Sequence, residues 1–359
     1  MSKKPVDNYA GCIMGGAIGD ALGAPIEFMS YNSITKKYGI SGVQDFVEFG
    51  NGKGEITDDT QMLLFTADGI LRSWHRAWIK GIGGAYSQLC YNSYLRWLYT
   101  QRDPNGKEDY SIPDLDGWLI RESFLYQRRA PGITCLTALE KGEPGSLFHS
   151  INNSKGCGGI MRVAPVGLLF HRYPEQAFQL GAELAAMTHG HPSGFLSAGF
   201  LSALIAYLNK GLDLIEAISN STLILKTYSN HEETLLAVEK ALKLFYEGNP
   251  NWHKVESLGG GWVGEEALSI SLYCALSHQK NFEEAIKLAI NHSGDSDSTG
   301  SITGNIVGLI CGEDAIPKRW RDNLCYYEKI KQIALDLHTE VMKDGQSSHD
   351  IWAFKYPHY

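Results

Sequence analysis

Apolar residues recur along most of this chain at the three- and four-residue spacing of helical turns. One such stripe occupies residues 59–73, and similar stripes occupy 174–188, 195–208, 231–246, 265–278 and 282–290. This spacing places the apolar side chains on one face of an α-helix. The alternating runs typical of strands are nearly absent, and the 12 prolines lie mostly between the helical stretches. The pattern therefore predicts an all-α fold.

We expect a single compact multi-helix domain, because no low-complexity linker divides the chain. Two segments rich in glycine and proline, 101–117 and 141–161, read as loops between helices. We place the domain at residues 9–340, with terminal segments at 1–8 and 341–359, and we interpret the last segment as a tail packed on the surface. A chain of 359 residues with 43% apolar and 20% charged residues has a globular composition and can bury a sizeable core.

Charge and cysteine content narrow the class of protein. The formal net charge of −8 argues against a bulk affinity for nucleic acid. The seven cysteines contain no CxxC pair, which argues against a disulfide framework and against a cysteine-built zinc site. The most apolar stretch, Ile302–Cys311, is too short to span a bilayer, and no signal-peptide core is visible near the start. We therefore expect a cytoplasmic protein without a membrane or nucleic-acid partner.

Glycines recur at every fourth residue in two parts of the chain. The first set is Gly11, Gly15, Gly19 and Gly23, and the second is Gly300, Gly304 and Gly308. A glycine inside a helix costs about 0.5–1 kcal/mol relative to alanine, so the pattern needs a compensating contact. Because the spacing puts each set on one helix face, we predict that the first and last core helices cross tightly. The alternative is that some glycines of the first set lie in turns.

Two acidic clusters carry the candidate chemistry. Residues 56–60 read ITDDT and residues 294–299 read GDSDST, and each cluster precedes a helical stretch. Helix capping explains one polar residue at each place, but not paired carboxylates beside hydroxyls in both. Carboxylates that lie close together repel unless a cation sits between them. Carboxylate and hydroxyl oxygens suit Mg²⁺, Mn²⁺ or Ca²⁺, so we favour a metal site over capping alone.

Other candidate residues are weaker evidence on their own. Asp20 and Glu27 flank a turn and could equally be solvated acids. The glycine loop 156–159 could point N–H groups at a phosphate, although it matches no nucleotide-binding signature. His189 suits a hydrogen bond better than a metal, and the arginine pair 128–129 is typical of a solvated turn.

Taken together and in this order, these segments resemble the ADP-ribosylglycohydrolase family. That family includes dinitrogenase reductase-activating glycohydrolases and ADP-ribosylarginine hydrolases. The matching stretches are GCIMGGAIGDALGAPIEF from Gly11, ITDDTQM from Ile56, RAPG from Arg129, GCGGIMR from Gly156, MTHGHPSG from Met187, GGGWVGEEAL from Gly259 and HSGDSDSTGSITGN from His292. The paired TDDT and GDSDST motifs are the specific part of the likeness. The stretch 95–118 and the tail after about 315 match no motif of the family.

The resemblance implies a compact all-α domain that holds two Mg²⁺ (or Mn²⁺) ions. The implied metal ligands are Thr57, Asp58, Asp59, Asp295, Asp297 and Ser298. Some family members have Thr where this chain has Ser298, and either hydroxyl can ligate. The implied catalytic residues are Glu27, near the scissile bond, with Asp58 and Asp297. The implied substrate-binding residues are Asp20, Gly132, Gly156, Cys157, Gly158, Gly159, His189 and Trp262.

The implied reaction is hydrolysis at C1″ of the distal ribose of an ADP-ribosylated protein side chain. Arginine is the favoured acceptor, while serine-linked and O-acyl ADP-ribose stay open, since relatives differ in linkage. Two other functions also stay open. The chain could be a non-catalytic protein that binds ADP-ribose or a partner, or a hydrolase that also inhibits a cognate ADP-ribosyltransferase by direct binding. All four aspartates of the implied metal site are present, which favours a hydrolase over a non-catalytic protein.

Overall fold

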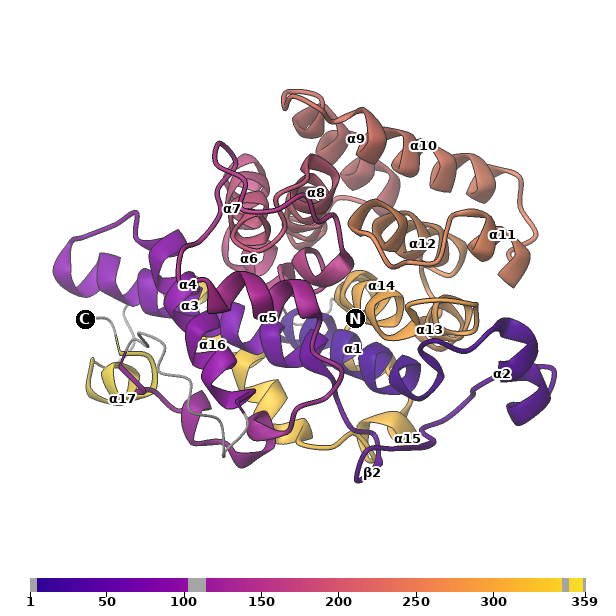
Figure 1. Cartoon of the computed structure of the whole chain (residues 1–359), viewed down its shortest axis with the longest axis horizontal. Coiled ribbons are helices and arrows are strands. Elements are labelled where there is room, and N and C mark those ends of the chain that lie inside the picture. The colour runs from indigo at the N-terminus through magenta and orange to yellow at the C-terminus, as the bar shows by residue number, and fades with distance from the viewer. Residues whose placement is uncertain (1–4, 103–113, 344–348, 358–359) are drawn as a thin grey trace.

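The computed structural model describes residues 5–102, 114–343 and 349–357. Helices dominate this part of the chain, so the predicted all-α fold is confirmed (Figure 1). The helices are α1 (Pro5–Gly23), α2 (Tyr31–Tyr38), α3 (Asp58–Lys80), α4 (Tyr86–Thr100), α5 (Ile133–Glu140), α6 (Ala164–Leu169), α7 (Pro174–Ala186), α8 (Pro192–Asn209), α9 (Leu214–Leu225), α10 (Glu232–Tyr246), α11 (Trp252–Ser257), α12 (Gly264–Ser277), α13 (Phe282–Ile290), α14 (Ser296–Cys311), α15 (Lys318–Arg321), α16 (Tyr327–Lys343) and α17 (His349–Lys355). The strands β1 (Glu48–Phe49) and β2 (Gly52–Lys53) pair antiparallel as a small hairpin.

Helices α1 and α14 lie side by side in the middle of the molecule (Figure 1). A Cβ atom on Gly11 would lie 2.2 Å from the carbonyl oxygen of Gly308, and one on Gly19 would lie 2.0 Å from that of Gly300. These pairs join the start of one helix to the end of the other, so the helices run antiparallel with their backbones in contact. The predicted tight crossing is confirmed, and the first set of glycines lies within α1 rather than in turns.

The crossing brings the end of α1 to the beginning of α14. A Cβ atom on Gly23, the last residue of α1, would lie 2.2 Å from the carbonyl oxygen of Ser296. A single 3₁₀ turn, Ala24–Ile26, follows, with Pro25 near its start. Glu27 follows this turn with φ −47° and ψ 139°, so the chain leaves the helix axis beside the first residues of α14. This places one acidic residue next to the second acidic cluster.

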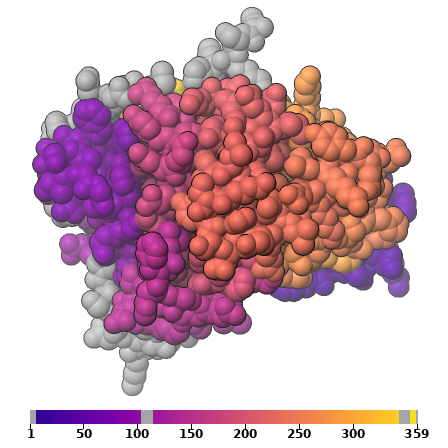
Figure 2. All heavy atoms as spheres, turned by 90° about the horizontal axis from the view of Figure 1, so that it is seen from above, coloured from indigo at the N-terminus to yellow at the C-terminus, as the bar shows by residue number. Residues whose placement is uncertain are grey.

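Other helices surround the central pair and bury one connected apolar core. It extends from Tyr9 in α1 through Phe200 in α8 and Leu268 in α12 to Ile306 in α14. Helices α9 and α10 lie at the top of the view in Figure 1. Figure 2 shows this face from above, and the middle part of the chain forms its centre. The site described below therefore rests on a rigid scaffold of packed helices.

The end of the chain differs from its sequence interpretation. Tyr356 is fully buried, and its hydroxyl donates a hydrogen bond to Asp336 of α16. Arg72 of α3 also donates a hydrogen bond to the carbonyl oxygen of Pro357, at 3.1 Å. The prediction of a tail packed on the surface is therefore wrong for these residues, because an aromatic side chain and a backbone carbonyl complete interactions inside the domain.

Within the described residues, no single helix is both long and apolar enough to cross a bilayer. The bent pair Val6–Ile26 and Tyr31–Tyr38 meets the criteria of length and composition when taken together. The predicted location in the cytoplasm stays a prediction.

Candidate functional site

A cavity of about 420 Å³ lies where the acidic segments meet. Its walls come from the turn after α1, the beginning of α3, the segment before α5, the glycine loop, the segment before α12 and the beginning of α14. The lining residues are Glu27, Phe28, Asp58, Asp59, Arg128, Ala130, Pro131, Gly132, Ile133, Cys157, Gly158, Met161, Trp262, Asp295, Asp297 and Ser298. Both acidic clusters and Glu27 therefore share one cavity, although more than 200 residues of chain separate the clusters.

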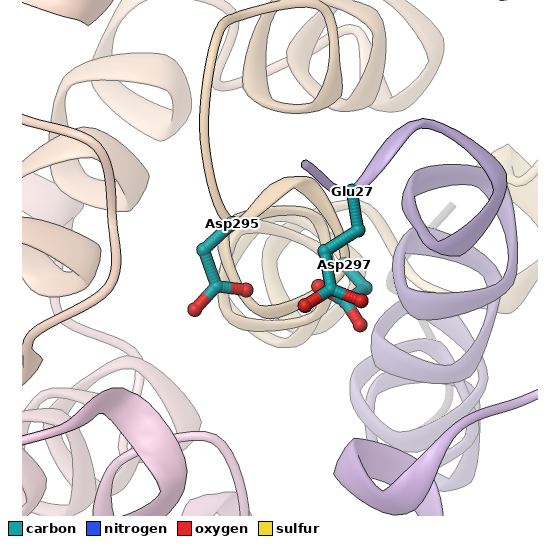
Figure 3. Close-up of side chains that lie close together, drawn as sticks. All are labelled: Glu27, Asp295 and Asp297. Atoms are coloured by element: carbon teal, nitrogen blue, oxygen red, sulfur yellow. The ribbon is translucent and has the colours of Figure 1, made fainter. Parts of the chain in front are cut away.

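Three carboxylates from two elements converge in this cavity. Oxygen atoms of Glu27, Asp295 and Asp297 all lie within 4.8 Å of one another. Figure 3 shows Glu27 reaching from the turn after α1 toward the two aspartates at the beginning of α14. Asp58 and Asp59 line the same cavity from the first turn of α3. Such a set of hard oxygen donors is typical of a site for divalent cations.

Burial and mutual repulsion perturb these acids. Removal from water, reinforced by Asp297, raises the pKa of Glu27 to about 9. Burial likewise raises the pKa of Asp58, Asp59 and Asp295 well above the ordinary range of a carboxyl group. The pKa of Asp297 is also raised, with burial as the main cause. A bound cation would offset both penalties, because it supplies positive charge where water is excluded.

Asp59 gives independent support for a cation. Its side chain is only 3% exposed, and its Oδ2 atom has no hydrogen-bond partner among the described residues. A buried polar atom without a partner costs about 1–3 kcal/mol, so such an atom calls for an explanation. An ion bound in the cavity would provide the missing partner. The residues present therefore fit the divalent cations that the sequence predicts.

Asp20 lies behind the cavity wall rather than in it. Its carboxylate accepts hydrogen bonds from the backbone N–H groups of Thr57, at 3.0 and 3.1 Å, and Thr60, at 3.2 Å. The hydroxyl groups of both threonines also donate to it. Burial raises the pKa of Asp20 to about 7. The alternative of a solvated acid is wrong for Asp20, which is fully buried and fixes the beginning of α3.

Thr57 caps α3 and does not line the cavity. Its hydroxyl oxygen accepts a hydrogen bond from the N–H of Asp59 while it donates to Asp20. At α14 the corresponding cap is Asp295, whose side chain accepts from the N–H of Ser298 at 3.3 Å. Helix capping therefore accounts for Thr57 and for one role of Asp295, and the caps fix the first helical turns from which Asp59 and Asp297 line the cavity. Ser298 lines the cavity together with Asp295, and its role as a metal ligand stays a prediction.

The glycine loop forms part of the cavity wall through a single turn, Cys157–Gly159. Cys157 and Gly158 line the cavity, whereas Gly156 and Gly159 do not. The loop is held against the segment before α12 by two backbone hydrogen bonds. The N–H of Cys157 donates to Trp262 at 3.1 Å, and the N–H of Gly264 donates to Lys155 at 2.7 Å.

His189 packs behind this loop. A Cβ atom on Gly158 would lie 3.1 Å from Cε1 of His189, whose side chain is only 1% exposed. Its Nδ1 atom shares a hydrogen bond of 2.8 Å with the hydroxyl of Thr188. Burial, reinforced by Arg162, lowers the pKa of His189 to about 3. In this structure His189 therefore supports the loop and does not reach the cavity.

The segment before α5 is tied to the first acidic cluster. The N–H of Gly132 donates to Asp58 at 3.1 Å, and the N–H of Asp58 donates to the carbonyl oxygen of Arg129 at 3.3 Å. Arg129 is 8% exposed and forms an ion pair with Glu55. The interpretation of the arginine pair as a solvated turn is wrong for Arg129, and Arg128 lines the cavity.

Sequence reasoning missed the apolar rim of the cavity. Phe28 is 75% exposed, has a positive φ of 66°, and stacks on Trp262 with ring centroids 5.0 Å apart. Ile133, which begins α5, is also strongly exposed, and Met161 lies deeper in the wall. The sequence hinted at these residues only by their neighbours, since Phe28 directly follows Glu27 and Ile133 directly follows the matched RAPG stretch. Their apolar character alone predicts burial in a core.

Known proteins resemble this chain over nearly its whole length. An uncharacterized protein of Archaeoglobus fulgidus is 27% identical over 94% of this chain and 99% of its own. The ADP-ribosylarginine hydrolase Tri1 of Serratia proteamaculans is 25% identical, over 92% of this chain and 79% of its own. The ADP-ribosyl-[dinitrogen reductase] glycohydrolase of Rhodospirillum rubrum is 22% identical, over 89% and 90%.

A solved structure and a family pattern agree with these relatives. The structure of an ADP-ribosylglycohydrolase-related protein complex superposes with a TM-score of 0.68 at 24% identity, covering 94% of this chain and 99% of that one, and it supports the fold. The sequence model of the ADP-ribosylglycohydrolase family matches residues 1–347. This match covers almost the whole chain, and the acidic motifs it spans line one cavity in the structure. The chain therefore belongs to the ADP-ribosylglycohydrolase family.

Proposed function

We propose that this chain removes ADP-ribose from modified protein side chains by hydrolysing the bond at C1″ of the distal ribose. Arginine is the preferred acceptor, and two divalent cations, Mg²⁺ or Mn²⁺, are the cofactors. The observation that carries the proposal is the convergence of five carboxylates, Glu27, Asp58, Asp59, Asp295 and Asp297, on one cavity that also has glycine in its wall. Membership of the family supports a hydrolase that acts on ADP-ribosyl groups.

The cations would be held by Asp58, Asp59, Asp295, Asp297 and the hydroxyl of Ser298. When bound, they would polarise the ribose hydroxyls and increase the acidity of a water molecule. Thr57 is the weakest member of the predicted ligand set, because its hydroxyl already donates a hydrogen bond to Asp20 and accepts one from the N–H of Asp59. We propose that Thr57 and Asp20 instead hold the aspartates of α3 in position.

Glu27 is the candidate for proton transfer. It is half-buried, it ends the turn after α1, and its carboxylate lies next to Asp297. From this place it can exchange a proton with the departing side chain or with water, which typically contributes about 10²–10⁴-fold in rate. Gly132 and Gly158 offer backbone without side chains on the other walls, where the ADP-ribose would lie.

Two observations favour arginine as the acceptor. Glu27 lines the cavity apart from the proposed metal ligands, and its carboxyl group can hydrogen-bond to the guanidinium of an arginine. Two relatives, from Serratia proteamaculans and Pseudomonas putida, are named ADP-ribosylarginine hydrolases, at 25% and 23% identity. Other relatives named ADP-ribosylhydrolase ARH3 match at similar identity, so the acceptor needs a direct test.

The test is release of ADP-ribose from two defined peptides, one arginine-linked and one serine-linked, by the full chain. Each reaction is run with Mg²⁺, with Mn²⁺ and with a chelator. We expect release from the arginine-linked peptide with metal and none with chelator. Asp297→Asn should abolish release, whereas the control Asp314→Asn, at a side chain that is 91% exposed, should not. Preferential release from the serine-linked peptide would contradict the proposed acceptor.

The same experiment separates the alternatives. A non-catalytic protein would bind ADP-ribose in calorimetry and release none from either peptide under any metal condition. Inhibition of a cognate ADP-ribosyltransferase by direct binding stays a prediction, which a pull-down with that transferase would test. The stretch 95–118, which matches no motif of the family, is the candidate segment for such binding, and its residues 103–113 lie outside the described part of the chain.

A further inference from the structure

The short segment that carries Glu27 has little packing of its own. None of residues 27–30 is buried, and Phe28 is 75% exposed with a φ of 66°. A bulky residue adopts such a left-handed backbone only where its surroundings hold it there. Contacts from outside the segment must therefore keep the carboxylate of Glu27 within 4.8 Å of oxygen atoms of Asp295 and Asp297.

Ser293 ties the far end of this segment to the chain just before α14. The backbone N–H of Tyr31, the first residue of α2, donates to the hydroxyl oxygen of Ser293 at 2.8 Å. The near end is fixed to α1, because the N–H of Glu27 donates to the carbonyl oxygen of Gly23 at 3.1 Å. Glu27 is thus held between two anchors, and the second anchor directly precedes the second acidic cluster.

The carboxylate of Glu256 in α11 holds Ser293 in this position. It accepts hydrogen bonds from the backbone N–H of Ser293, at 3.0 Å, and from its hydroxyl group. Hydrogen bonds to a carboxylate are stronger than those between neutral groups, so the hydroxyl oxygen stays aimed at the N–H of Tyr31. One turn earlier in α11, Trp252 stacks on the ring of Tyr31 with centroids 3.8 Å apart. Helix α11 therefore holds both the backbone and the side chain of Tyr31.

The second acidic cluster is anchored to the same part of the chain. The N–H of Asp295 donates to the carbonyl oxygen of Gly260 at 2.8 Å, so the stretch 252–260 supports Asp295 as well as Ser293. We propose that Ser293 is a positioning residue that holds Glu27 at its distance from the aspartates of α14. The inference rests on the proposed hydrolysis, in which Glu27 transfers the proton and Ser293 acts only through it.

The test removes the hydrogen bond at Tyr31, away from the carboxylates. Tyr31→Pro lacks the N–H and its matched control Tyr31→Ala keeps it, while both lose the ring that stacks on Trp252. Proline suits this place, because Tyr31 begins a helix and Ser30 before it is extended, with ψ 153°. We expect kcat for release of ADP-ribose to be about 10- to 100-fold lower in Tyr31→Pro than in Tyr31→Ala, with equal ADP-ribose affinity in calorimetry.

A second comparison separates positioning from general damage to the site. In a Glu27→Gln background, Tyr31→Pro and Tyr31→Ala should have the same kcat, because the hydrogen bond acts only through Glu27. A difference that persists in this background overturns the inference. Equal kcat of the two variants when Glu27 is present overturns it as well.

Hydrogen exchange tests the anchor without hydrolysis. Ser293→Ala should speed exchange in peptides that cover residues 28–31 by about tenfold or more, because the N–H of Tyr31 loses its acceptor. The control Ser257→Ala, at an exposed hydroxyl in α11 that donates to the carbonyl oxygen of Lys254, should leave this exchange unchanged.

The outcomes keep this inference apart from the proposed function. Unchanged exchange in folded Ser293→Ala overturns the inference, and if that variant fails to fold, the two variants of Tyr31 decide. A wild type that releases no ADP-ribose contradicts the proposed hydrolysis, whereas the exchange experiment still shows whether Ser293 holds the segment with Glu27.

Discussion

Gly15 and Gly304 face each other with no room for a side chain on either. A Cβ atom on Gly15 would lie 2.4 Å from the carbonyl oxygen of Gly304, and one on Gly304 would lie 2.0 Å from that of Gly15. Both distances are far shorter than a van der Waals contact, and both partners are backbone atoms that cannot rotate away. The contact between α1 and α14, and through it the meeting of Glu27 with Asp297, depends on these glycines.

Gly304→Ala should therefore destabilise the protein, although alanine favours a helix over glycine by about 1 kcal/mol. We expect a loss of about 1–3 kcal/mol in the free energy of unfolding, because the two helices must separate to admit the methyl group. Urea unfolding measures the change.

The matched control is Gly83→Ala, because a Cβ atom there meets nothing within 4 Å and its φ is not positive. This control should leave the free energy of unfolding within about 0.5 kcal/mol of the wild type. If Gly304→Ala is as stable as the wild type, the close contact between these helices is wrong.

Glu27→Gln keeps the shape of the side chain and removes the carboxyl group that can give up or take a proton. We expect kcat for release of ADP-ribose to fall by about 10²–10⁴-fold, with little change in ADP-ribose affinity measured by calorimetry. The control is Glu48→Gln in β1, whose side chain is 77% exposed and lies outside the cavity. A Glu27 variant that turns over like this control would remove Glu27 from the mechanism.

His189 makes the folded protein sensitive to acid. Its pKa is about 3 when folded, below the ordinary value of 6.5, because burial disfavours the charged ring. The unfolded chain therefore takes up a proton that the folded chain does not, so stability falls as the pH drops from about 6.5 toward 3. Between pH 7 and pH 5 this residue should account for roughly 2 kcal/mol of that loss.

The measurement is urea unfolding of His189→Gln at pH 7 and pH 5. The difference between the two free energies of unfolding should shrink by roughly 2 kcal/mol relative to the wild type. His149→Gln, at an exposed histidine, should leave the difference unchanged. Equal pH dependence in wild type and His189→Gln would show that the ring is not buried in its neutral form.

Local patterns in the sequence predicted the parts of the site that repeat or cluster. Four-residue glycine spacing indicated the α1–α14 crossing, and paired aspartates beside hydroxyls indicated the carboxylates that line the cavity. The two acidic clusters could be assigned to one site only through the resemblance to a family. Spacing alone does not say which distant segments meet.

The sequence does not predict the surroundings of a single side chain as well as it predicts repeated patterns. Asp20 and His189 are buried behind the cavity wall and do not line the cavity. The residues next to them in the sequence do not show whether a side chain lines a cavity or supports a residue that does. Phe28 and Ile133 were missed for the opposite reason, since an exposed apolar side chain has the same sequence signature as a core residue. In both cases the tertiary packing decides the role.

Tyr356 tests whether the end of the chain belongs to the folded domain. Its ring is fully buried, its hydroxyl donates to Asp336, and its backbone N–H donates to Trp352 at 2.7 Å. Tyr356→Ala should cost about 3–5 kcal/mol, as for other large buried aromatic residues, because it leaves a cavity and removes one hydrogen bond of Asp336.

Two residues earlier, Phe354 is 61% exposed, and the guanidinium carbon of Arg121 lies 4.5 Å from the centroid of its ring. Phe354→Ala should therefore cost no more than about 1 kcal/mol, the value of an exposed contact between a cation and an aromatic ring. Urea unfolding of the two variants side by side makes the comparison, because both remove one aromatic ring from the same segment. Equal and small losses would mean that this segment is a surface tail after all, whereas a large loss confined to Tyr356→Ala would make it a structural part of the domain that holds the site.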